Sequence, residues 1–352
     1  MMTEIISINN INPEISKIRI AASVIKNGGI VVFPTETVYG MGANAFDINA
    51  CQKIFDIKNR PMDNPLIVHI YKMEQLHEVA MDVSEDVQKT LRVLWPGPIT
   101  FIFRKNSKVP NEVTGGLGTV AVRMPAHPIA LRLIEESGTP IAAPSANIAS
   151  KPSPTKARHA VDELNGKVDM IIDGGDALFG IESTIINLTS KPYSLLRPGA
   201  FTVQELERYF GEIEIPKGLN KPIMDSDIAL APGTKYKHYS PEKMLVAIEG
   251  RELMLQAIEI VSRRKKIAVL CSNELAEKLK GVKTIKLGSE KNLYEIAQSL
   301  FDSFRILDKL DVDIGLIQSF SQTGMGLAVM NRIIKASGEE PLTSIEQVKE
   351  KF

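Results

Sequence analysis

The chain has 352 residues, a length at which one hydrophobic core usually gives way to two, so it predicts two domains. Its 42 Lys and Arg residues equal its 42 Asp and Glu residues, and with a formal net charge of zero no global basic field exists to hold nucleic acid non-specifically. With 44% apolar and 24% charged residues, the composition excludes a disordered or fibrous chain.

The N-terminus and the cysteines bear on where the protein is found. Residues 1–10 carry Glu4 and no basic stretch leading into an apolar run, so no signal peptide is predicted. No uncharged apolar run approaches the length of a membrane span. Cys51 and Cys271 lie far apart without a CxxC motif, which favours two buried thiols in a reducing compartment. These features predict a cytoplasmic protein with no membrane contact.

In the first half of the chain, apolar runs alternate with amphipathic stretches. Apolar residues recur at helical spacing over 15–26 and Gly28 follows, which predicts a helix with a glycine stop. Strands are expected at 30–33, 66–71, 99–103, 120–124, 141–143, 170–172 and 184–188. Some intervals between strands are too short for helical crossovers, so the pattern predicts a mixed sheet with helices packed on it.

The second half divides into a linker and a regular α/β pattern. A short helix is expected at 203–209, after which residues 215–241 lose clear periodicity and are rich in Pro and Gly. Strands at 245–248, 267–271, 283–287 and 314–317 then alternate with helices at 252–262, 274–279, 292–310 and about 326–337, which predicts a small parallel α/β domain. The predicted organisation is an N-terminal domain over 1–210, a linker over 211–241 and a C-terminal domain over 242–352.

Polar residues gather between residues 34 and 69, where predicted elements end. Thr35 follows a strand and a proline, so its hydroxyl either meets a ligand or forms an ST turn or helix cap, which is the more common role. Lys58 and Arg60 end a predicted helix just before Pro61. They either complement the helix dipole on a solvated face or clamp phosphate oxygens, and the residues alone leave both interpretations open.

Further hydrogen-bonding residues lie near other strand ends. His69 ends an apolar run, and a lone histidine there is more often a satisfied core residue than a catalyst. Residues 143–147, which read Ala-Pro-Ser-Ala-Asn, lead to Ser153 and Thr155, each a candidate helix N-cap. Such turns can also present N–H and hydroxyl groups to a phosphate, although the GxxxxGK[ST] loop is absent from the sequence.

Arg123 lies among apolar residues of a predicted strand and therefore needs a carboxylate partner. That partner is either an Asp or Glu of the chain or the carboxylate of a bound amino acid. Ser183 and Arg197 add another hydroxyl and another cation. The sequence has no HExxH, no cysteine and histidine zinc spacing and no GxSxG elbow. The residues by themselves thus predict a cationic pocket for a small ligand.

Five motifs follow one another in a specific order along the first half. They are Pro34-Thr35-Glu36-Thr37-Val38-Tyr39-Gly40, Lys58-x-Arg60-Pro61, Asn64-Pro65-Leu66, Ser145-Ala146-Asn147 and Ser153-Pro154-Thr155. Together they resemble the YrdC-like family of threonylcarbamoyl-AMP synthases, and residues 232–241 with the α/β half resemble its two-domain form. The resemblance covers nearly the whole chain. It implies an N-terminal YrdC-like mixed twisted sheet with helices and a smaller C-terminal Rossmann-like parallel α/β domain.

The resemblance also implies a reaction. L-threonine, bicarbonate or CO2, and ATP would give threonylcarbamoyl-adenylate and pyrophosphate, and the adenylate would serve the modification of a tRNA adenosine beside the anticodon. The implied partners are these substrates, downstream proteins that transfer the threonylcarbamoyl group to tRNA, and a weak RNA contact. Mg2+ is implied as a cofactor that bridges the phosphates, with no metal ligand identified on the protein.

By motif position, the residues divide into two sets. Those that resemble the family's threonine site are Thr35, His69, Arg123, Ala143 and Ser183, with Arg123 pairing the carboxylate. Those that resemble its ATP site are Lys58, Arg60, Asn64, Thr119, Ser145, Asn147, Ser153, Arg197, Tyr236 and Tyr239, of which Lys58 and Arg60 are the expected catalytic residues. The choice between Tyr236 and Tyr239 as ligand contact stays open.

Three positions depart from the pattern expected of the family. Ala149-Ser150 replaces the usual Ser-Gly, Asn187 stands where Asp is frequent, and residues 234–237 read Thr-Lys-Tyr-Lys where Met-Lys-Tyr-Arg is common. Losing a glycine restricts φ, so the first departure is expected to alter the phosphate turn near Ser153.

Two other functions compete with the synthase. An RNA-binding module would line a groove with Lys58, Arg60, Arg123 and Arg197 and would bind RNA with a steep salt dependence, indifferent to threonine. Zero net charge counts against it. A nucleotide sensor in the C-terminal half would show ligand protection confined to residues 244–352.

Overall fold

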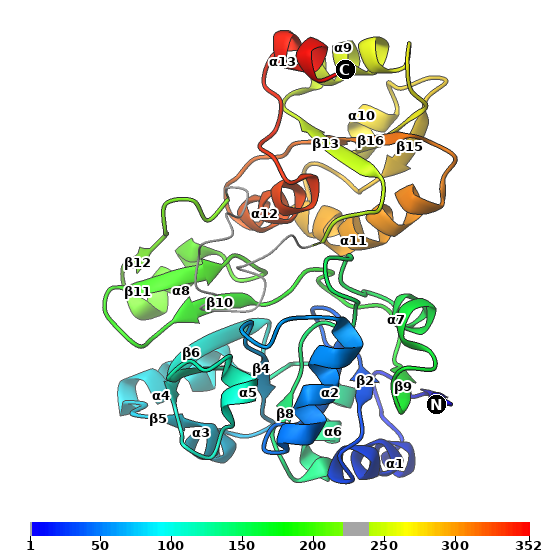
Figure 1. Cartoon of the computed structure of the whole chain (residues 1–352). Coiled ribbons are helices and arrows are strands. Elements are labelled where there is room, and N and C mark those ends of the chain that lie inside the picture. Colours follow the sequence, from blue (N-terminus) through cyan, green and yellow to red (C-terminus); the bar gives the residue numbers. More distant parts are fainter. Residues whose placement is uncertain (1, 221–238) are drawn as a thin grey trace. The chain divides into compact units, whose positions relative to one another are not determined.

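The computed structural model describes residues 2–220 and 239–352. Among these residues, the chain forms two compact units, one of residues 2–149 and 153–216 and another of residues 150–152, 217–220 and 239–352 (Figure 1). Within the described ranges, no helix combines the length and the apolarity that crossing a bilayer requires. Cys51 and Cys271 are buried free thiols, as the sequence predicts.

The first unit contains a long mixed sheet with helices packed on it. Its elements are β1 (Glu4–Ser7), α1 (Ile15–Lys26), β2 (Val31–Phe33), β3 (Gly40–Asn44), α2 (Ile48–Lys58), β4 (Ile67–His69), α3 (Met73–Val79), β5 (Ala80–Met81), α4 (Glu85–Leu94), β6 (Ile99–Lys105), α5 (Asn111–Thr114), β7 (Thr119–Arg123), α6 (Pro128–Ser137), β8 (Ile141–Ala142), α7 (Ala157–Leu164), β9 (Met170–Asp173), β10 (Thr184–Asn187), β11 (Tyr193–Arg197), α8 (Val203–Phe210) and β12 (Ile213–Glu214). The strand order is β1-β9-β2-β3-β8-β4-β7-β6-β10-β11-β12, with β5 paired to β6. Both parallel and antiparallel pairs occur along it, which confirms the predicted mixed sheet.

The core of this unit follows from helix periodicity. In α1, Ile18 and Ile25 lie two turns apart on the buried face, and the helix gives way to a turn at Asn27 and Gly28, where φ is 74°. This face packs with α6 against strand residues such as Phe33 and Ile172. The apolar stripe predicted from the sequence is therefore the stripe that the fold buries.

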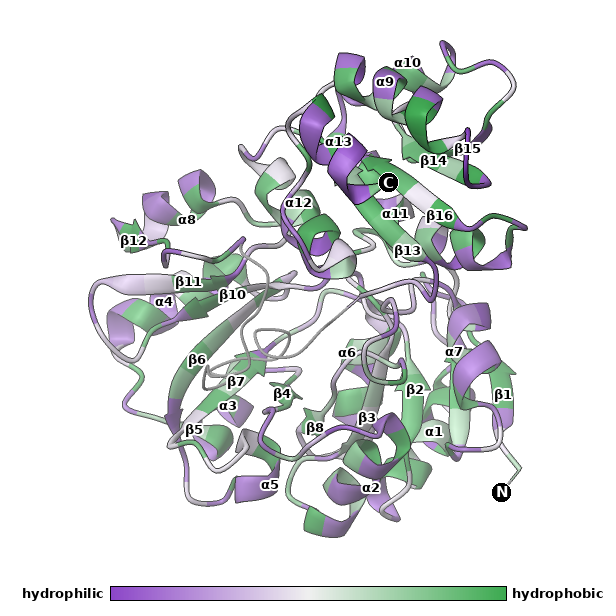
Figure 2. Cartoon of the chain, turned by 45° about the horizontal axis from the view of Figure 1, so that its top comes forward, coloured by the Kyte–Doolittle hydropathy of each residue, from purple (hydrophilic) through white to green (hydrophobic). Residues whose placement is uncertain are grey.

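The second unit is a small parallel α/β structure. Its elements are β13 (Met244–Ile248), α9 (Arg251–Val261), β14 (Ile267–Cys271), α10 (Asn273–Ala276), β15 (Lys283–Lys286), α11 (Leu293–Lys309), β16 (Ile314–Gln318), α12 (Met325–Ser337) and α13 (Ile345–Lys351). All pairs in the order β13-β16-β14-β15 are parallel, as predicted. Figure 2 shows that β13 is hydrophobic, and each of its residues except Met244 is buried, as expected for a strand covered on both faces.

Every strand and helix named from the sequence is present, with ends shifted by a few residues. No residue range was predicted for β1, β3, β5, β11 and β12, for helices α3 to α6, or for the short helix α13. Strand β3 reads Gly-Met-Gly-Ala-Asn, which has neither the alternation nor the β-branched residues that mark a strand. It forms because β2 and β8 pair with it on either side.

Candidate functional site

The loop after β2 is organised by the hydroxyl of Thr35. Its Oγ1 accepts the backbone N–H groups of Thr37 and Val38 at 3.2 Å each, donates to Val38 O at 2.6 Å and lies 2.8 Å from Thr37 Oγ1. No helix begins here, so of the ordinary roles open to Thr35 the ST turn is realised rather than the helix cap. Both hydroxyls are buried.

Arg123, at the end of β7, is held by this loop. Its Nη1 donates to Thr37 Oγ1 at 2.8 Å and its Nε donates to Gly97 O at 3.3 Å. Its Nη2 lies 2.6 Å from Oε1 of Glu36, and both side chains are buried. In this structure the carboxylate required by a buried arginine therefore comes from the chain itself.

His69 ends β4 and lies opposite Arg123 in the parallel register of β4 and β7. Its Nδ1 is 3.2 Å from Ile67 O. Burial, and secondly the charge of Arg123, lowers the pKa of His69 to about 3, so the imidazole is neutral at physiological pH. A neutral ring can donate one hydrogen bond and accept another, which suits a ligand hydroxyl better than a ligand charge.

Ser183 joins two further strands to this region. Its hydroxyl is 2.7 Å from Thr100 Oγ1, and Thr100 lies opposite Arg123 in the pairing of β6 and β7. Arg197, the last residue of β11, donates from Nε to Ser183 O and from Nη2 to Ser183 Oγ, each at 3.0 Å. Hydrogen bonds and strand register thus connect four residues of the threonine set, Thr35, His69, Arg123 and Ser183. The fifth, Ala143, donates its backbone N–H to Ile67 O at 2.9 Å.

Lys58 ends α2 and is buried, so the interpretation of this lysine as part of a solvated helix face is wrong. Its Nζ donates to Ser145 O at 2.6 Å and to Asn147 O at 2.5 Å. Burial, and secondly the charge of Arg60, lowers the pKa of Lys58 well below its usual range. The lysine ties the loop after β8 to the end of α2, and an anion bound there would favour its charged form.

Arg60 and Asn64 lie in the loop between α2 and β4. Arg60 is half-buried and donates from Nη2 to the carbonyls of Asn64 and Pro65 at 2.9 and 3.0 Å. The side chain of Asn64 is fully buried, yet neither its amide nitrogen nor its oxygen has a hydrogen-bond partner among the described residues. Since buried polar groups are normally satisfied, this carboxamide is a good candidate for a ligand contact.

Three other residues of the ATP set lie in the N-terminal unit, two after β8 and one at the start of β7. Ser145 is half-buried and pairs with Gly40, and buried Asn147 donates from Nδ2 to Ile148 O at 2.8 Å. Thr119 begins β7, at the end of the strand opposite Arg123.

In the C-terminal unit, the ring of buried Tyr239 stacks on that of Phe301, with centroids 5.1 Å apart. Tyr236 lies outside the described residues, so the choice between the two tyrosines stays open.

The N-cap prediction for Ser153 and Thr155 is wrong. Helix α7 begins after Lys156, whose side chain makes no capping bond. The Ser153 hydroxyl instead donates to buried Glu182 at 2.5 Å, because the preceding turn directs it into the protein interior. Ser150, in the position where a glycine was expected, keeps the left-handed conformation with φ 71°.

Several residues of this region were not singled out from the sequence. Glu36 and Glu182 are buried carboxylates beside Arg123 and Ser153, and Thr37 and Thr100 are buried hydroxyls that bridge predicted residues. Glu36 and Thr37 belong to a quoted motif, so the signal was present in three consecutive polar residues after a strand. Thr100 and Glu182 carry no such signal, because only strand pairing and loop folding bring them to the site.

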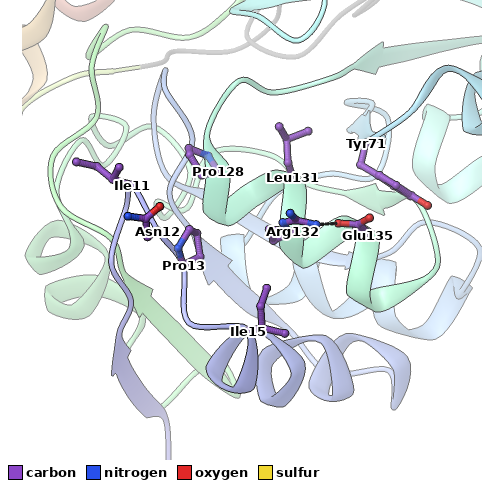
Figure 3. A pocket seen from close by; sticks show the side chains of 9 residues that line it. All are labelled: Ile11, Asn12, Pro13, Ile15, Tyr71, Pro128, Leu131, Arg132 and Glu135. Atoms are coloured by element: carbon purple, nitrogen blue, oxygen red, sulfur yellow. Dashed lines mark hydrogen bonds and ion pairs between the residues drawn. The ribbon is translucent and has the colours of Figure 1, made fainter.

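Two cavities are lined by none of the residues that the sequence predicts for the binding site. One of about 600 Å3 lies between the N-terminal loop and α6, and Arg132 and Glu135, which form an ion pair at 2.5 Å along α6, line it on the helix side (Figure 3). The other, of about 660 Å3, lies after the carboxyl ends of β13 and β16, and the residues that line it include Glu249 and Glu340 but no Lys or Arg. Such a lining does not favour a phosphate ligand in this cavity.

The residues that the structure describes form no group of three or more His, Cys, Asp or Glu side chains suited to a metal ion. The ATP set consists of cations, amides, hydroxyls and tyrosines rather than carboxylates. This donor set fits phosphate oxygens, and it fits a Mg2+ ion only when the ion arrives with the phosphates.

Comparisons with known proteins agree with this architecture. Residues 23–199 match the Sua5, YciO and YrdC family, described as telomere recombination, and residues 201–338 match the threonylcarbamoyl-AMP synthase C-terminal domain. Threonylcarbamoyl-AMP synthase of Pyrococcus abyssi is 47% identical, over 92% of this chain and 94% of the relative. The protein of the same name from Bacillus subtilis is 41% identical, over 96% of each.

Solved structures extend the likeness to the fold. The crystal structure of P. abyssi Sua5 complexed with L-threonine superposes with a TM-score of 0.91 and 44% identity, covering 97% of this chain and all of that one. Escherichia coli YciO, with a TM-score of 0.53 and 26% identity, covers 58% of this chain.

The mixed sheet with its buried cations and the parallel C-terminal unit define an α/β enzyme of the YrdC-like class in its two-domain form. The chain belongs to the threonylcarbamoyl-AMP synthase family, and its reaction is of the nucleotidyltransferase type.

Proposed function

We propose that the protein makes L-threonylcarbamoyl-AMP and pyrophosphate from L-threonine, bicarbonate or CO2, and ATP. The observation that carries the proposal is a buried guanidinium, Arg123, joined through Thr37 to the Thr35 loop and aligned with neutral His69. A guanidinium suits an α-carboxylate, and neutral hydrogen-bonding groups suit the hydroxyl of threonine. A relative at 44% identity was solved in complex with L-threonine, which supports the same ligand here.

In the proposed reaction, the α-ammonium group of threonine first loses a proton to solvent, and the free amine then adds to CO2 and releases a second proton to solvent as the carbamate forms. An oxygen of the carbamate attacks the α-phosphorus, and the bond to pyrophosphate breaks as pyrophosphate leaves. Because the attacking group is already anionic, the protein has to position the reactants and neutralise charge rather than supply a strong base. Lys58, Arg60, Asn64 and Arg197 would do so at the phosphates and the nucleotide, with Ser145, Asn147, Ser153, Thr119 and a linker tyrosine as further contacts. Mg2+ brought with ATP would spread the developing phosphate charge.

The wider role is proposed on the same basis. The adenylate would be consumed by proteins that transfer the threonylcarbamoyl group to a tRNA adenosine beside the anticodon, in the cytoplasm. Residues 1–210 would form the catalytic domain, 211–241 the linker and 242–352 a C-terminal domain. Because the net charge is zero, any direct RNA contact would be weak.

The deciding experiment measures pyrophosphate release by the purified chain with ATP and Mg2+ while threonine and bicarbonate are omitted one at a time. Mass spectrometry detects the adenylate in parallel. Release that requires both co-substrates is the expected result. Folded protein that releases no pyrophosphate, but binds RNA with a steep salt dependence, would refute the synthase in favour of an RNA-binding module.

Single substitutions separate the two halves of the site. Replacing Lys58 or Arg60 with Ala is expected to raise KM for ATP about tenfold or more, whereas Arg123→Ala should mainly raise KM for threonine. Lys53→Ala is the matched control, because this exposed lysine lies on the same helix as Lys58 and bonds only Gly28 O among the described contacts. Unchanged steady-state kinetics in the variants would contradict these roles.

A further inference from the structure

Glu36 is a buried carboxylate whose hydrogen bonding is incomplete. Its residue is 6% exposed, and its Oε1 lies 2.6 Å from Nη2 of Arg123. Apart from this ion pair, neither carboxylate oxygen accepts a hydrogen bond from any residue that the structure describes. Buried carboxylates normally accept several, and leaving one unsatisfied is costly. A group with this deficit is suited to a donor from outside the chain.

The two members of the pair are anchored differently. Arg123 is fixed by Thr37 through Nη1 and by Gly97 through Nε, whereas only the backbone of Glu36 is fixed, by the N–H of Phe179 at 2.9 Å. The guanidinium therefore has a set position, whereas among the described contacts the carboxylate is held by its ion pair with Arg123. A guanidinium has five N–H groups, so Arg123 retains donors for a second carboxylate.

Among the residues that the structure describes, the ion-pair partner of Glu36 is Arg123. His127 is the titratable neighbour whose pKa Glu36 influences, and burial lowers the pKa of its imidazole to about 4. His127 is therefore neutral at physiological pH, and its Nδ1 is already used to accept the N–H of Ile129. One carboxylate thus faces one guanidinium in a region where both are desolvated.

We infer that Glu36 binds the α-ammonium group of the incoming amino-acid substrate, before this group loses its proton and reacts, while Arg123 binds the α-carboxylate. This inference rests on the proposed function. The charged groups of an α-amino acid are borne by one carbon, so their partners must be neighbours, as Glu36 and Arg123 are. Binding exchanges one ion pair within the chain for two with the ligand. The pair then selects zwitterions over amines and over simple carboxylic acids.

The test compares three ligands by calorimetric titration of the full chain. L-threonine has both charged groups, its methyl ester has only the ammonium group, and 3-hydroxybutanoate has only the carboxylate. Glu36→Gln is expected to weaken L-threonine and the ester about tenfold or more and to leave 3-hydroxybutanoate unchanged or tighter. Arg123→Ala should weaken L-threonine and 3-hydroxybutanoate but spare the ester.

Two further variants keep the result interpretable. Glu36→Asp retains the negative charge on a shorter side chain. Its affinity for L-threonine should lie between those of the unaltered chain and of Glu36→Gln. If Glu36→Gln does not fold, the affinity of Glu36→Asp is compared with that of the unaltered chain instead. Glu136→Gln, in which a half-buried carboxylate paired with Arg19 is neutralised, should leave all three affinities unchanged.

Three outcomes would overturn the inference. Equal weakening of 3-hydroxybutanoate and L-threonine by Glu36→Gln would mean that Glu36 only orients Arg123. Unchanged L-threonine affinity would exclude any role in binding. Absence of threonine binding by the unaltered chain, with or without ATP, would refute the proposed function and this inference with it.

Discussion

At the scale of single residues, two buried basic side chains of the site, Lys58 and Arg123, donate hydrogen bonds to segments that are distant in the sequence. Lys58 bonds carbonyls of the loop after β8, and Arg123 bonds the loop after β2. Each contact satisfies a charge that burial would otherwise make costly. The same contacts hold the two side chains in place before any ligand binds, so less ordering remains to be done at the moment of binding.

His69 links stability to pH. Because its pKa is about 3 in the folded chain and 6.5 is its ordinary value, the unfolded chain binds a proton that the folded chain does not bind between these pH values. The free energy of unfolding therefore falls as pH is lowered through this window, by about 2 kcal/mol from pH 7 to pH 5 for this residue.

Urea denaturation at pH 7 and pH 5 checks this prediction. The His69→Gln variant should lose about 2 kcal/mol less than the unaltered chain between the two pH values, because the glutamine does not titrate. His127, whose pKa is also lowered, contributes equally to both proteins and cancels in the comparison. The same pH dependence in both proteins would show that His69 does not remain neutral.

At the scale of elements, the end of α2 decides where Lys58 and Arg60 lie. Asn59 between them is the C-cap, with φ 51° in the left-handed region, and its N–H bonds Asp56 O. Asparagine tolerates this conformation better than most residues, and β-branched residues tolerate it worst.

We therefore expect Asn59→Val to lower the free energy of unfolding by about 1 kcal/mol and to impair ATP use, because the chain must leave this conformation or remain strained in it. Asn59→Gly should change stability by no more than a few tenths of a kcal/mol. Chemical denaturation together with ATP kinetics measures both effects. A valine variant as stable and as active as the glycine variant would contradict this account of the helix end.

The turn after β11 approaches the site closely. A β-carbon on Gly199 would lie 2.3 Å from Thr184 N and 2.7 Å from Ser183 C, which are backbone atoms that cannot turn aside. Gly199→Ala is therefore expected to lower the free energy of unfolding by about 2 kcal/mol and to disturb the contact between Ser183 and Arg197.

Gly118→Ala is the control for this substitution, since no described atom lies within 4 Å of the added β-carbon and its φ is not positive. Thermal denaturation should show a lowered Tm for the Gly199 variant and little change for the Gly118 variant. Equal Tm values for the two variants would mean that the turn after β11 can relax without cost.

At the scale of the whole molecule, each unit has its own apolar core, one including Phe33 and Ile172 and the other including Ile248 and Val269. Scanning calorimetry is expected to resolve two transitions. Ile248→Ala, which truncates a fully buried side chain, should lower only the transition of the C-terminal unit. A single transition that shifts as a whole would mean that the two cores unfold together.

The same measurement locates the ligands. ATP with L-threonine, each at about 100 times its Kd, should stabilise the N-terminal transition by about 2.7 kcal/mol for each site filled. The transition of the C-terminal unit should not respond. Stabilisation confined to the C-terminal unit would instead support the nucleotide-sensor interpretation, which the acidic lining of its cavity does not favour.

The sequence by itself determined the elements with strong periodicity and the class of fold. The stripe of α1 and the continuous apolar runs of β14 and β16 were predictable because burial of one helix face or of a whole strand leaves a regular mark. The ordered motifs placed the chain in its family, since their residues and spacing are rarely met together. Strand β3 escaped prediction because neighbouring strands, not its own residues, make it extended.

Only the tertiary structure decided which polar residues meet. The sequence required a carboxylate for Arg123 but not Glu36 in particular, because the loop after β2 and the end of β7 are 86 residues apart where Thr37 and Arg123 bond. The sequence left Lys58 equally suited to a solvated helix face and to a binding site. Lys58 is buried because its ammonium group donates to a carbonyl of the loop after β8. Long-range contacts depend on how strands pair and loops pack, and neither leaves a periodic mark in the sequence.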